Sequence, residues 1–397
     1  MLAMSGVGCV ASRRPATAPT PGIHADSARP ATDTIRGRES GSAGYVVPLP
    51  IDPHHGPRRF YTGKNYGSEA EFNPLTQFVN EGFDVLSGRN ANRHIFDRPH
   101  EADARNVFRS IIRAPQALQE FGWGNVLRAE VLPTSFTRTR TSGKWISNYQ
   151  LHMFGSGMVS LRMTDWYDIH GYRHPALLGQ ATTMAAHYLN EMTENNGQTE
   201  LNEDPVVDLL FFDVAGFALW HQHWMQRLFS EKYYLTNWPG QPTYDPVNGT
   251  LENTGQYFVL RGPLPAVKTW DFFYVFGMSG SVGLSKTIGG GKALSLGTGF
   301  DILEPRPATD TSLATARQIL PKAALYFDRN GSLMWSVLLG NRTAANRLTV
   351  NMYPGVFRIH GFTTGAWMQL PKNGGVRAGL VSKWGVGLSG ASSSARP

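Results

Sequence analysis

Residues 272–302 read FFYVFGMSGSVGLSKTIGGGKALSLGTGFDI. Large apolar side chains alternate here with Gly, Ala and Ser, first from Tyr274 to Leu284 and again from Leu294 to Ile302. Successive strand residues point to opposite faces, so one face of this pair is bulky and apolar and the other is almost bare. A soluble sandwich would carry polar or charged side chains on its outer face. The pattern therefore predicts two antiparallel strands whose bulky face meets lipid.

The same alternation continues toward the C-terminus. One run, Leu333–Leu339, follows the turn sequence DRNG, and a last run covers Val376–Leu388. In the last run Arg377 and Lys383 fall opposite the apolar residues, where a wet or protein-filled interior tolerates them. We therefore expect a mainly β chain with an α insert, whose strands form an antiparallel transmembrane-type β-barrel of roughly 8–12 strands. Its expected interfacial aromatic residues are Trp335, Trp367, Trp384, Tyr326 and Tyr353.

Composition excludes several other classes of protein. The chain has 397 residues, 43 of them glycine, and only 17% are charged. No run of about 20 apolar residues occurs, which argues against a helical membrane span. The net charge of +7 is spread over the chain without a nucleic-acid-binding motif. We therefore expect no nucleic-acid partner and attribute the positive charge to attraction toward anionic lipid.

Cys9 is the only cysteine, which excludes a disulfide within the chain and a metal site built on cysteines. The preceding sequence, MSGVG, resembles a bacterial lipoprotein processing box, although Gly6 stands where that box has an aliphatic residue. Either Cys9 is lipidated or the segment is a shortened export signal. Both interpretations place the mature protein in the envelope.

Composition also divides the chain into five segments. Early strands are expected near 126–141, a long helix over 175–195, and a second helix from Asp204-Pro205 to Lys232. A face of small residues invites close approach, so we expect the helices to pack inside the barrel or across its mouth. Alternatively, the small residues only suit a narrow, strongly curved barrel.

The five segments are 1–44, a disordered tail or export remnant; 45–144, a mixed region with early strands; 145–240, a helical insert; 250–390, the antiparallel barrel strands; and 391–397, a tail.

The helical insert concentrates polar residues that could carry chemistry. His187, Asn190, Glu191 and Glu194 fall on one stripe of the first helix, at spacings of three and four. Such a stripe could bind a metal through His187 and Glu191 or supply acid–base catalysis. Alternatively, these residues satisfy buried polar groups and helix ends. The catalytic candidates are His187, Glu191, Glu194 and Asp208, within a wider polar cluster that adds His152, Asn190, Asp204 and Asp213.

No established catalytic, phosphate-binding or dinucleotide-binding motif occurs in the sequence. The Gly-rich sequence GGGK at 289–292 lies between two alternating strands, so it predicts a hairpin turn and not a phosphate loop. We therefore expect no cofactor, and the absence of a catalytic motif favours a protein without enzymatic activity.

The strand half of the chain resembles bacterial outer-membrane β-barrel proteins. The middle resembles uncharacterised envelope families in which a glutamate-bearing helix precedes an acidic Asp-Leu helix that ends in glycine. A more distant similarity is to VanZ-like helix pairs, which share a spaced His, Glu, Asp and Gly pattern. The residues that match the envelope families are Asn190-Glu191, Glu194, Asp204-Pro205, Asp208-Leu209 and Gly216.

These resemblances imply an integral β-barrel protein of the bacterial outer membrane, either structural or engaged in handling lipids or small molecules. Its expected partners are outer-membrane lipids and a lipid or small-molecule ligand. One alternative is an envelope enzyme that acts on lipid or glycan through the polar residues of the helical insert. Another is a soluble periplasmic protein whose bulky strand faces pack against each other.

Overall fold

The computed structural model describes residues 59–88, 92–136, 141–265, 267, 269–302, 319–340, 346–359, 362–383 and 385–392. The predictions for the 1–44 tail, for Cys9, for Trp384 and for residues 393–397 lie outside the described residues.

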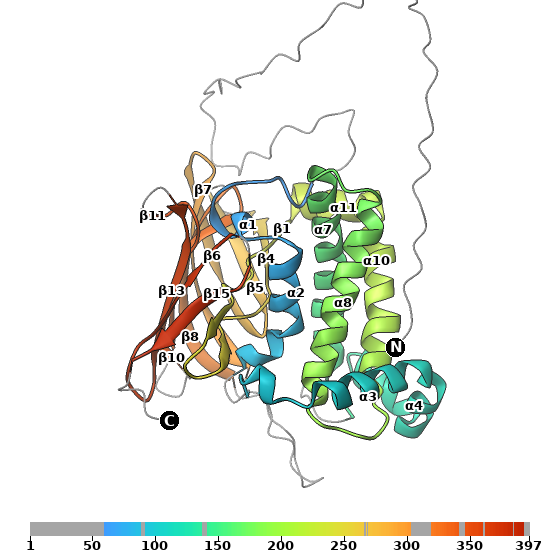
Figure 1. The fold of residues 1–397 in the computed structure, drawn as a ribbon. Coiled ribbons are helices and arrows are strands. Elements are labelled where there is room, and N and C mark those ends of the chain that lie inside the picture. The colour runs from blue at the N-terminus through green and yellow to red at the C-terminus, as the bar shows by residue number, and fades with distance from the viewer. Residues whose placement is uncertain are drawn as a thin grey trace, which may run out of the picture. The chain divides into compact units, whose positions relative to one another are not determined.

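Helices fill the first part of the described chain (Figure 1). The α-helices are α1 (Gly67–Ala70), α2 (Pro74–Gly82), α3 (His100–Ile112), α4 (Ala114–Phe121), α5 (Trp123–Val126), α6 (Trp145–Ser147), α7 (Gly157–Ile169), α8 (Pro175–Asn195), α9 (Asp204–Val207), α10 (Val214–Trp220) and α11 (His223–Arg227). The 3₁₀-helices are η1 (Asp84–Ser87) and η2 (Ile95–Asp97), and the π-helical turns are η3 (Leu127–Val131), η4 (Asn148–Ser156), η5 (Asp208–Asp213) and η6 (Leu228–Lys232).

Strands fill the second part and form one large, mostly antiparallel sheet of 13 strands in the order β1-β4-β5-β6-β7-β8-β9-β10-β13-β14-β15-β2-β3. The protein is therefore mainly β with α-helices. The strands are β1 (Tyr234–Asn237), β2 (Thr243–Asp245), β3 (Thr250–Glu252), β4 (Tyr257–Pro263), β5 (Trp270–Gly277), β6 (Ser279–Gly289), β7 (Lys292–Ile302), β8 (Ile319–Arg329), β9 (Ser332–Gly340), β10 (Asn346–Met352), β13 (Gly365–Pro371), β14 (Arg377–Val381) and β15 (Gly387–Ala391). A second sheet pairs β11 (Arg358–Ile359) with β12 (Phe362–Thr363).

The two long helices were predictable from their end signals. Helix α8 spans Pro175–Asn195, as predicted, with proline in its first turn and Asn196 in a left-handed conformation after its end. The second helix begins at Asp204 as predicted, but it does not run unbroken to Lys232. It is interrupted after Trp220, where Gln222 adopts an extended conformation at the N-cap position of α11.

Where the structure describes residues 126–141, the predicted early strands are absent, and helices begin well before residue 145. Described residues from this segment form α5 and η3 instead. The buried side chain of Glu130 accepts a hydrogen bond from Asn148 and pairs with Lys144, contacts that hold the chain in a helical turn. The strands also begin earlier than predicted, at Tyr234 rather than at 250.

The predicted alternation along the strands is confirmed by burial. On β6 and β7 the bulky residues Leu284 and Leu296 are 46% and 62% exposed. Their neighbours along the chain, Ser285 and Ser295, are fully buried. Register places Leu284 opposite Leu296, so the large side chains form one continuous face. We call this the bulky face and the opposite one the small-residue face. Exposed members of the bulky face are Val282, Leu284, Leu294, Leu296, Leu339, Leu380 and Leu388.

The small-residue face is buried and polar. Arg261 on β4 forms an ion pair with Asp328 on β8, and both side chains are almost completely buried. Ser281 and Tyr326 share a hydrogen bond of 2.8 Å, and the Ser295 hydroxyl donates to Ser285 at 2.9 Å. Apolar contacts on the same face come from Trp238, Val259, Phe273, Val275, Ala324, Tyr326, Leu333 and Tyr353.

This burial corrects the prediction of interfacial aromatic residues. Trp367, Tyr326 and Tyr353 are buried, at 2%, 6% and 2% exposure, and Tyr326 and Tyr353 belong to the core of the small-residue face. Their large rings fill space that Gly and Ser leave on neighbouring strands. Trp335 lies on the bulky face, where its ring stacks on Phe327.

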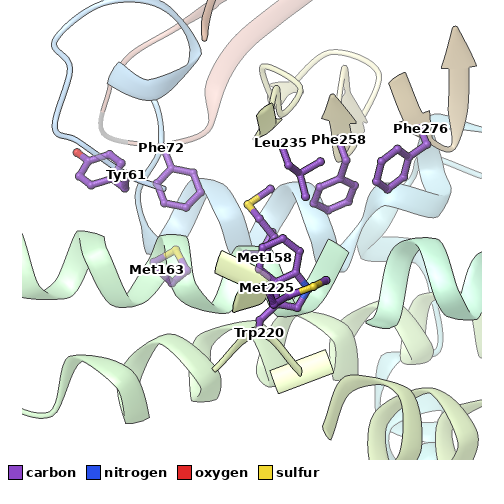
Figure 2. Packing of buried hydrophobic residues seen from close by; sticks show 10 residues of the cluster. Tyr61, Phe72, Met158, Met163, Trp220, Met225, Leu235, Phe258 and Phe276 are labelled. Carbon is purple, nitrogen blue, oxygen red and sulfur yellow. The ribbon is translucent and has the colours of Figure 1, made fainter. Parts of the chain in front are cut away.

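Helices of the predicted insert cover one part of the bulky face, whereas they were expected to approach the small residues. Phe258 of β4 and Phe276 of β5 stack on each other and pack against helical residues such as Met158 and Trp220 (Figure 2). A Cβ at Gly155 would lie 2.7 Å from the Phe258 ring, so this glycine permits the close contact. The buried guanidinium of Arg162 also donates to the Asn237 carbonyl oxygen of β1 at 2.8 Å.

The short helix α1 lies at the turn between β8 and β9. The Glu69 amide donates to the Ser332 hydroxyl at 3.0 Å, and the Leu333 amide donates to the Ser68 hydroxyl at 3.1 Å. Among the described residues, no helix combines the length and the hydropathy that a membrane span requires.

Candidate functional site

A buried network of histidines and carboxylates connects four helical elements. Its members are Glu81 of α2, His152 of η4, His187 and Glu191 of α8, and Asp208 and Asp213 of η5. All six residues are at most 9% exposed. We call this set the histidine network.

Glycines allow the helices that carry this network to approach closely. A Cβ at Gly216 would lie 2.6 Å from the Met153 carbonyl oxygen, and a Cβ at Gly157 would lie 2.1 Å from the Trp220 ring. Side chains larger than hydrogen would therefore separate η4 and α7 from η5 and α10. The close approach brings His152 and Asp213 within hydrogen-bonding distance.

Asp213 lies at the centre of the network and binds both imidazoles. Its Oδ2 atom is 2.7 Å from His187 Nδ1, and its Oδ1 atom is 3.1 Å from His152 Nδ1. The other nitrogen of His187 lies 2.7 Å from Glu81 Oε1, and Glu81 Oε2 accepts from Gln77 at 2.9 Å. His152 Nε2 instead faces Asp208 Oδ2, at 3.5 Å.

The charges of the network shift several pKa values. Burial lowers the pKa of His187, but the charges of Asp213 and Glu81 outweigh it and hold that pKa well above its usual range. In its protonated form His187 donates from both nitrogens, from Nδ1 to Asp213 and from Nε2 to Glu81. Burial raises the pKa of Asp213, but His187 and His152 outweigh it and lower that pKa.

Two further carboxyls are shifted in the opposite direction. Burial raises the pKa of Asp208 to about 8, although the nearby His152 lowers it. Burial raises the pKa of Glu191 well above its usual range, and the neighbouring charges of Asp208 and Glu194 raise it further. Each of these two carboxyls lacks the compensation that Asp213 receives from two histidines.

A second group of carboxylates surrounds Lys144, with Glu130 and Glu203 buried and Asp204 partly exposed. The Nζ atom lies 3.0 Å from Glu130 Oε1, 2.9 Å from Glu203 Oε1 and 2.5 Å from Asp204 Oδ1. Burial lowers the pKa of Lys144, but the three acidic side chains outweigh it and raise that pKa above its usual range. We call these four residues the Lys144 centre. It is a closed ion cluster with its own cation.

The structure brings together most of the residues that the sequence singled out. His152, His187, Glu191, Asp208 and Asp213 meet in the histidine network, whereas Asp204 belongs to the Lys144 centre. Glu194 is exposed and outside both groups. The Asn190 amide donates to the Glu81 backbone oxygen at 3.0 Å, which is a structural contact between α8 and α2.

Sequence reasoning missed Glu81, Glu130, Lys144 and Glu203. Glu81 lies more than 60 residues before the insert that was singled out, at the last turn of α2, and no local pattern links it to His187. The only local signal was Gln77 one turn earlier, which indicates a polar stripe on that helix. Lys144 fell at the boundary between two predicted segments.

A cavity of about 150 Å³ lies on the small-residue face of the sheet. Its polar lining includes Lys322, Thr349, Asn351 and Gln369, and Tyr326 and Tyr353 add aromatic rings. The Lys322 ammonium donates to Ser279 at 2.7 Å. A mixed polar and aromatic lining of this kind suits a small polar molecule or water.

Comparison of this chain with protein-family models, with curated proteins and with solved structures finds no match.

Proposed function

We propose that this chain is an integral β-barrel protein of the bacterial outer membrane, with a structural role or a role in handling lipids or small molecules. The observation that carries the proposal is the polarity of the sheet. Leu296 and Leu388 on the bulky face are 62% and 68% exposed, while the Arg261–Asp328 ion pair is buried on the opposite face. Water would favour the reverse arrangement, and lipid favours this one.

Hydrogen bonds between the ladders support closure of the sheet into a barrel. Beyond β1, the Trp238 amide donates to the Tyr257 oxygen and the Gly240 amide to the Gly255 oxygen, both at 2.7 Å. These bonds continue the β1–β4 ladder toward the β2–β3 ladder. On this view β1 and β2 are parts of one bent strand, and β3 and β4 are parts of another. With β1 continued into β2 and β3 into β4, the order of strands would return from β15 through β2 to β4.

Strand directions support the same closure. When β1 joins β2 and β3 joins β4, the 13 strands of the sheet become 11. A ring with an odd number of strands needs one parallel pair, and β15 pairs with β2 in parallel while the other neighbours are antiparallel. This number lies within the predicted range, although bacterial barrels usually have an even number of strands.

The alternative of an envelope enzyme is less well supported. Both nitrogens of His187 are already engaged, by Asp213 and Glu81, and Glu191 is only 4% exposed. A general base must reach the proton that it abstracts, either directly or through one water. The cavity on the small-residue face, by contrast, supports a role in binding a small molecule.

The proposal is tested with the full chain exported in a Gram-negative host. Carbonate washing should leave the protein in the membrane fraction, and detergent should release it. Leu296→Arg should cost about 2–4 kcal/mol of stability if Leu296 faces hydrocarbon, measured by urea unfolding in lipid vesicles. The control is Val247→Arg, because Val247 is 88% exposed in the turn between β2 and β3. Release by carbonate, or equal stability of the two variants, would refute membrane insertion.

A further inference from the structure

One edge of the histidine network has the geometry of a metal site. Ligand atoms of His152, Glu191 and Asp208 all lie within 4.8 Å of one another. Asp208 Oδ1 is buried and has no hydrogen-bond partner among the described residues. The three residues come from three different helical elements, so the fold and not local sequence brings them together.

The distance between His152 and Asp208 leaves room for a bridging ion. His152 Nε2 lies 3.5 Å from Asp208 Oδ2, beyond the usual range for an N–H···O bond. Two ligand atoms of a tetrahedral zinc ion, each about 2.0–2.1 Å from the metal, lie about 3.3–3.4 Å apart. The observed separation matches the metal-bridged arrangement.

Asp213 supplies the outer support that metal-binding histidines have. Its Oδ1 atom accepts a hydrogen bond from His152 Nδ1, which fixes the ring and directs Nε2 toward Asp208. Asp213 is fully buried and is itself held by His187. The imidazole is therefore pre-oriented with its second nitrogen available to a ligand.

Charge also favours a cation at this edge. The positive charge of His187 offsets the negative charges of Asp213 and Glu81, which it contacts directly. The charge of Lys144 offsets that of Asp204. Glu191 and Asp208 each place a carboxylate oxygen within 4.8 Å of a ring nitrogen of His152. Two buried carboxylates with a single imidazole are costly when ionised unless a cation joins them.

We propose that His152, Glu191 and Asp208 bind one divalent transition-metal ion, with Asp213 as a positioning residue. One nitrogen and two carboxylate ligands suit Zn²⁺, Mn²⁺ or Fe²⁺, whereas Ca²⁺ and Mg²⁺ prefer oxygen ligands alone. Binding displaces the protons of His152 Nε2 and of the two carboxyls, so affinity rises with pH. The site is formed by helices alone and does not depend on the placement of the sheet in a membrane.

The probe is Zn²⁺, titrated by calorimetry into the full chain that has been stripped with EDTA and purified in detergent. We expect one Zn²⁺ per chain and a rise in the unfolding temperature on binding. Asp208→Asn and Glu191→Gln should each weaken binding by at least about tenfold. Glu194→Gln is the matched control, because Glu194 lies on the same helix but is exposed. Circular dichroism checks that every variant is folded.

Cobalt gives a second readout on the unmodified protein. Co²⁺ bound by imidazole and carboxylates produces visible absorption bands, and Zn²⁺ should displace them in a one-to-one ratio. His152→Gln should abolish these bands, whereas Glu194→Gln should keep them. The proposal is overturned if the wild-type chain binds no Zn²⁺, or if folded Asp208→Asn and Glu191→Gln variants bind it as tightly as the control.

Discussion

Two groups of mostly buried carboxylates lie next to each other in the helical part of this protein, and they obtain positive charge in different ways. Asp204 belongs to the Lys144 centre, and Asp208, one helical turn later, belongs to the histidine network. The Lys144 centre contains a permanent cation with three carboxylate contacts. The histidine network has only imidazoles, whose charge depends on pH and on bound ions. The first centre is therefore suited to stability and the second to a change of state.

The largest expected effect sharpens this contrast by removing the permanent cation. Lys144→Met should destabilise the protein by about 3–5 kcal/mol, because the buried Glu130 and Glu203 and the partly buried Asp204 lose their shared partner. Lys232→Met is the control, since Lys232 is exposed, and it should change stability by less than about 0.5 kcal/mol. Urea unfolding followed by tryptophan fluorescence in detergent measures both. A Lys144→Met variant as stable as the control would show that the centre is not held by its lysine.

A second prediction concerns the carboxylate that organises the histidine network. Asp213→Asn weakens the charged hydrogen bonds to His152 and His187, and each should cost about 1.5–3 kcal/mol of the free energy of unfolding. The total loss of stability should therefore approach that of Lys144→Met. The matched control is Asp168→Asn, which breaks the exposed pair with Arg59 and should cost about 0–1 kcal/mol. If the two asparagine variants unfold at the same urea concentration, Asp213 is not the structural centre of the network.

Sequence reasoning predicted one of these groups better than the other, for a physical reason. His187 and Glu191 stand four residues apart on α8, so periodicity alone places them on one face, and Asp208 stands at the same spacing after Asp204 on the next helix. No local sequence pattern links Lys144 to Glu130. The two side chains pair only because α5, η3 and η4 pack together in the fold. Glu81 was missed because long-range contacts leave no local signal.

The sheet shows the same division between local and long-range information. The alternation of Leu284 and Leu296 with Ser285 and Ser295 fixed both faces, because strand period is local. The position of the helices was not predictable in this way. They cover the bulky face at Phe258 and Phe276, while Tyr326 and Trp238 fill the small-residue face. Which side chains cover the bulky face and which fill the small-residue face depends on how neighbouring strands and helices pack.

The remaining prediction has the smallest expected effect and tests the titratable character of the histidine network. Burial raises the pKa of Asp208 from 3.8 to about 8, so the folded protein holds this proton more tightly than the unfolded chain does. Its contribution to stability is fully present at low pH and is lost as pH rises from about 4 to about 8. His187, whose pKa is also raised, adds a loss in the same direction above about pH 6.5.

Lys144 should not contribute to this pH dependence. Its raised pKa keeps it charged until pH rises above the usual range for lysine, so its stabilisation is constant between about pH 6 and pH 9. In EDTA, the wild-type chain should therefore be less stable to urea at about pH 9 than at about pH 6. Asp208→Asn, which cannot ionise, should show a smaller difference and should be at least as stable as wild type at the higher pH. An unchanged pH profile in this variant would mean that Asp208 does not titrate between these values, and that its charge is compensated within the fold as completely as the charges around Lys144.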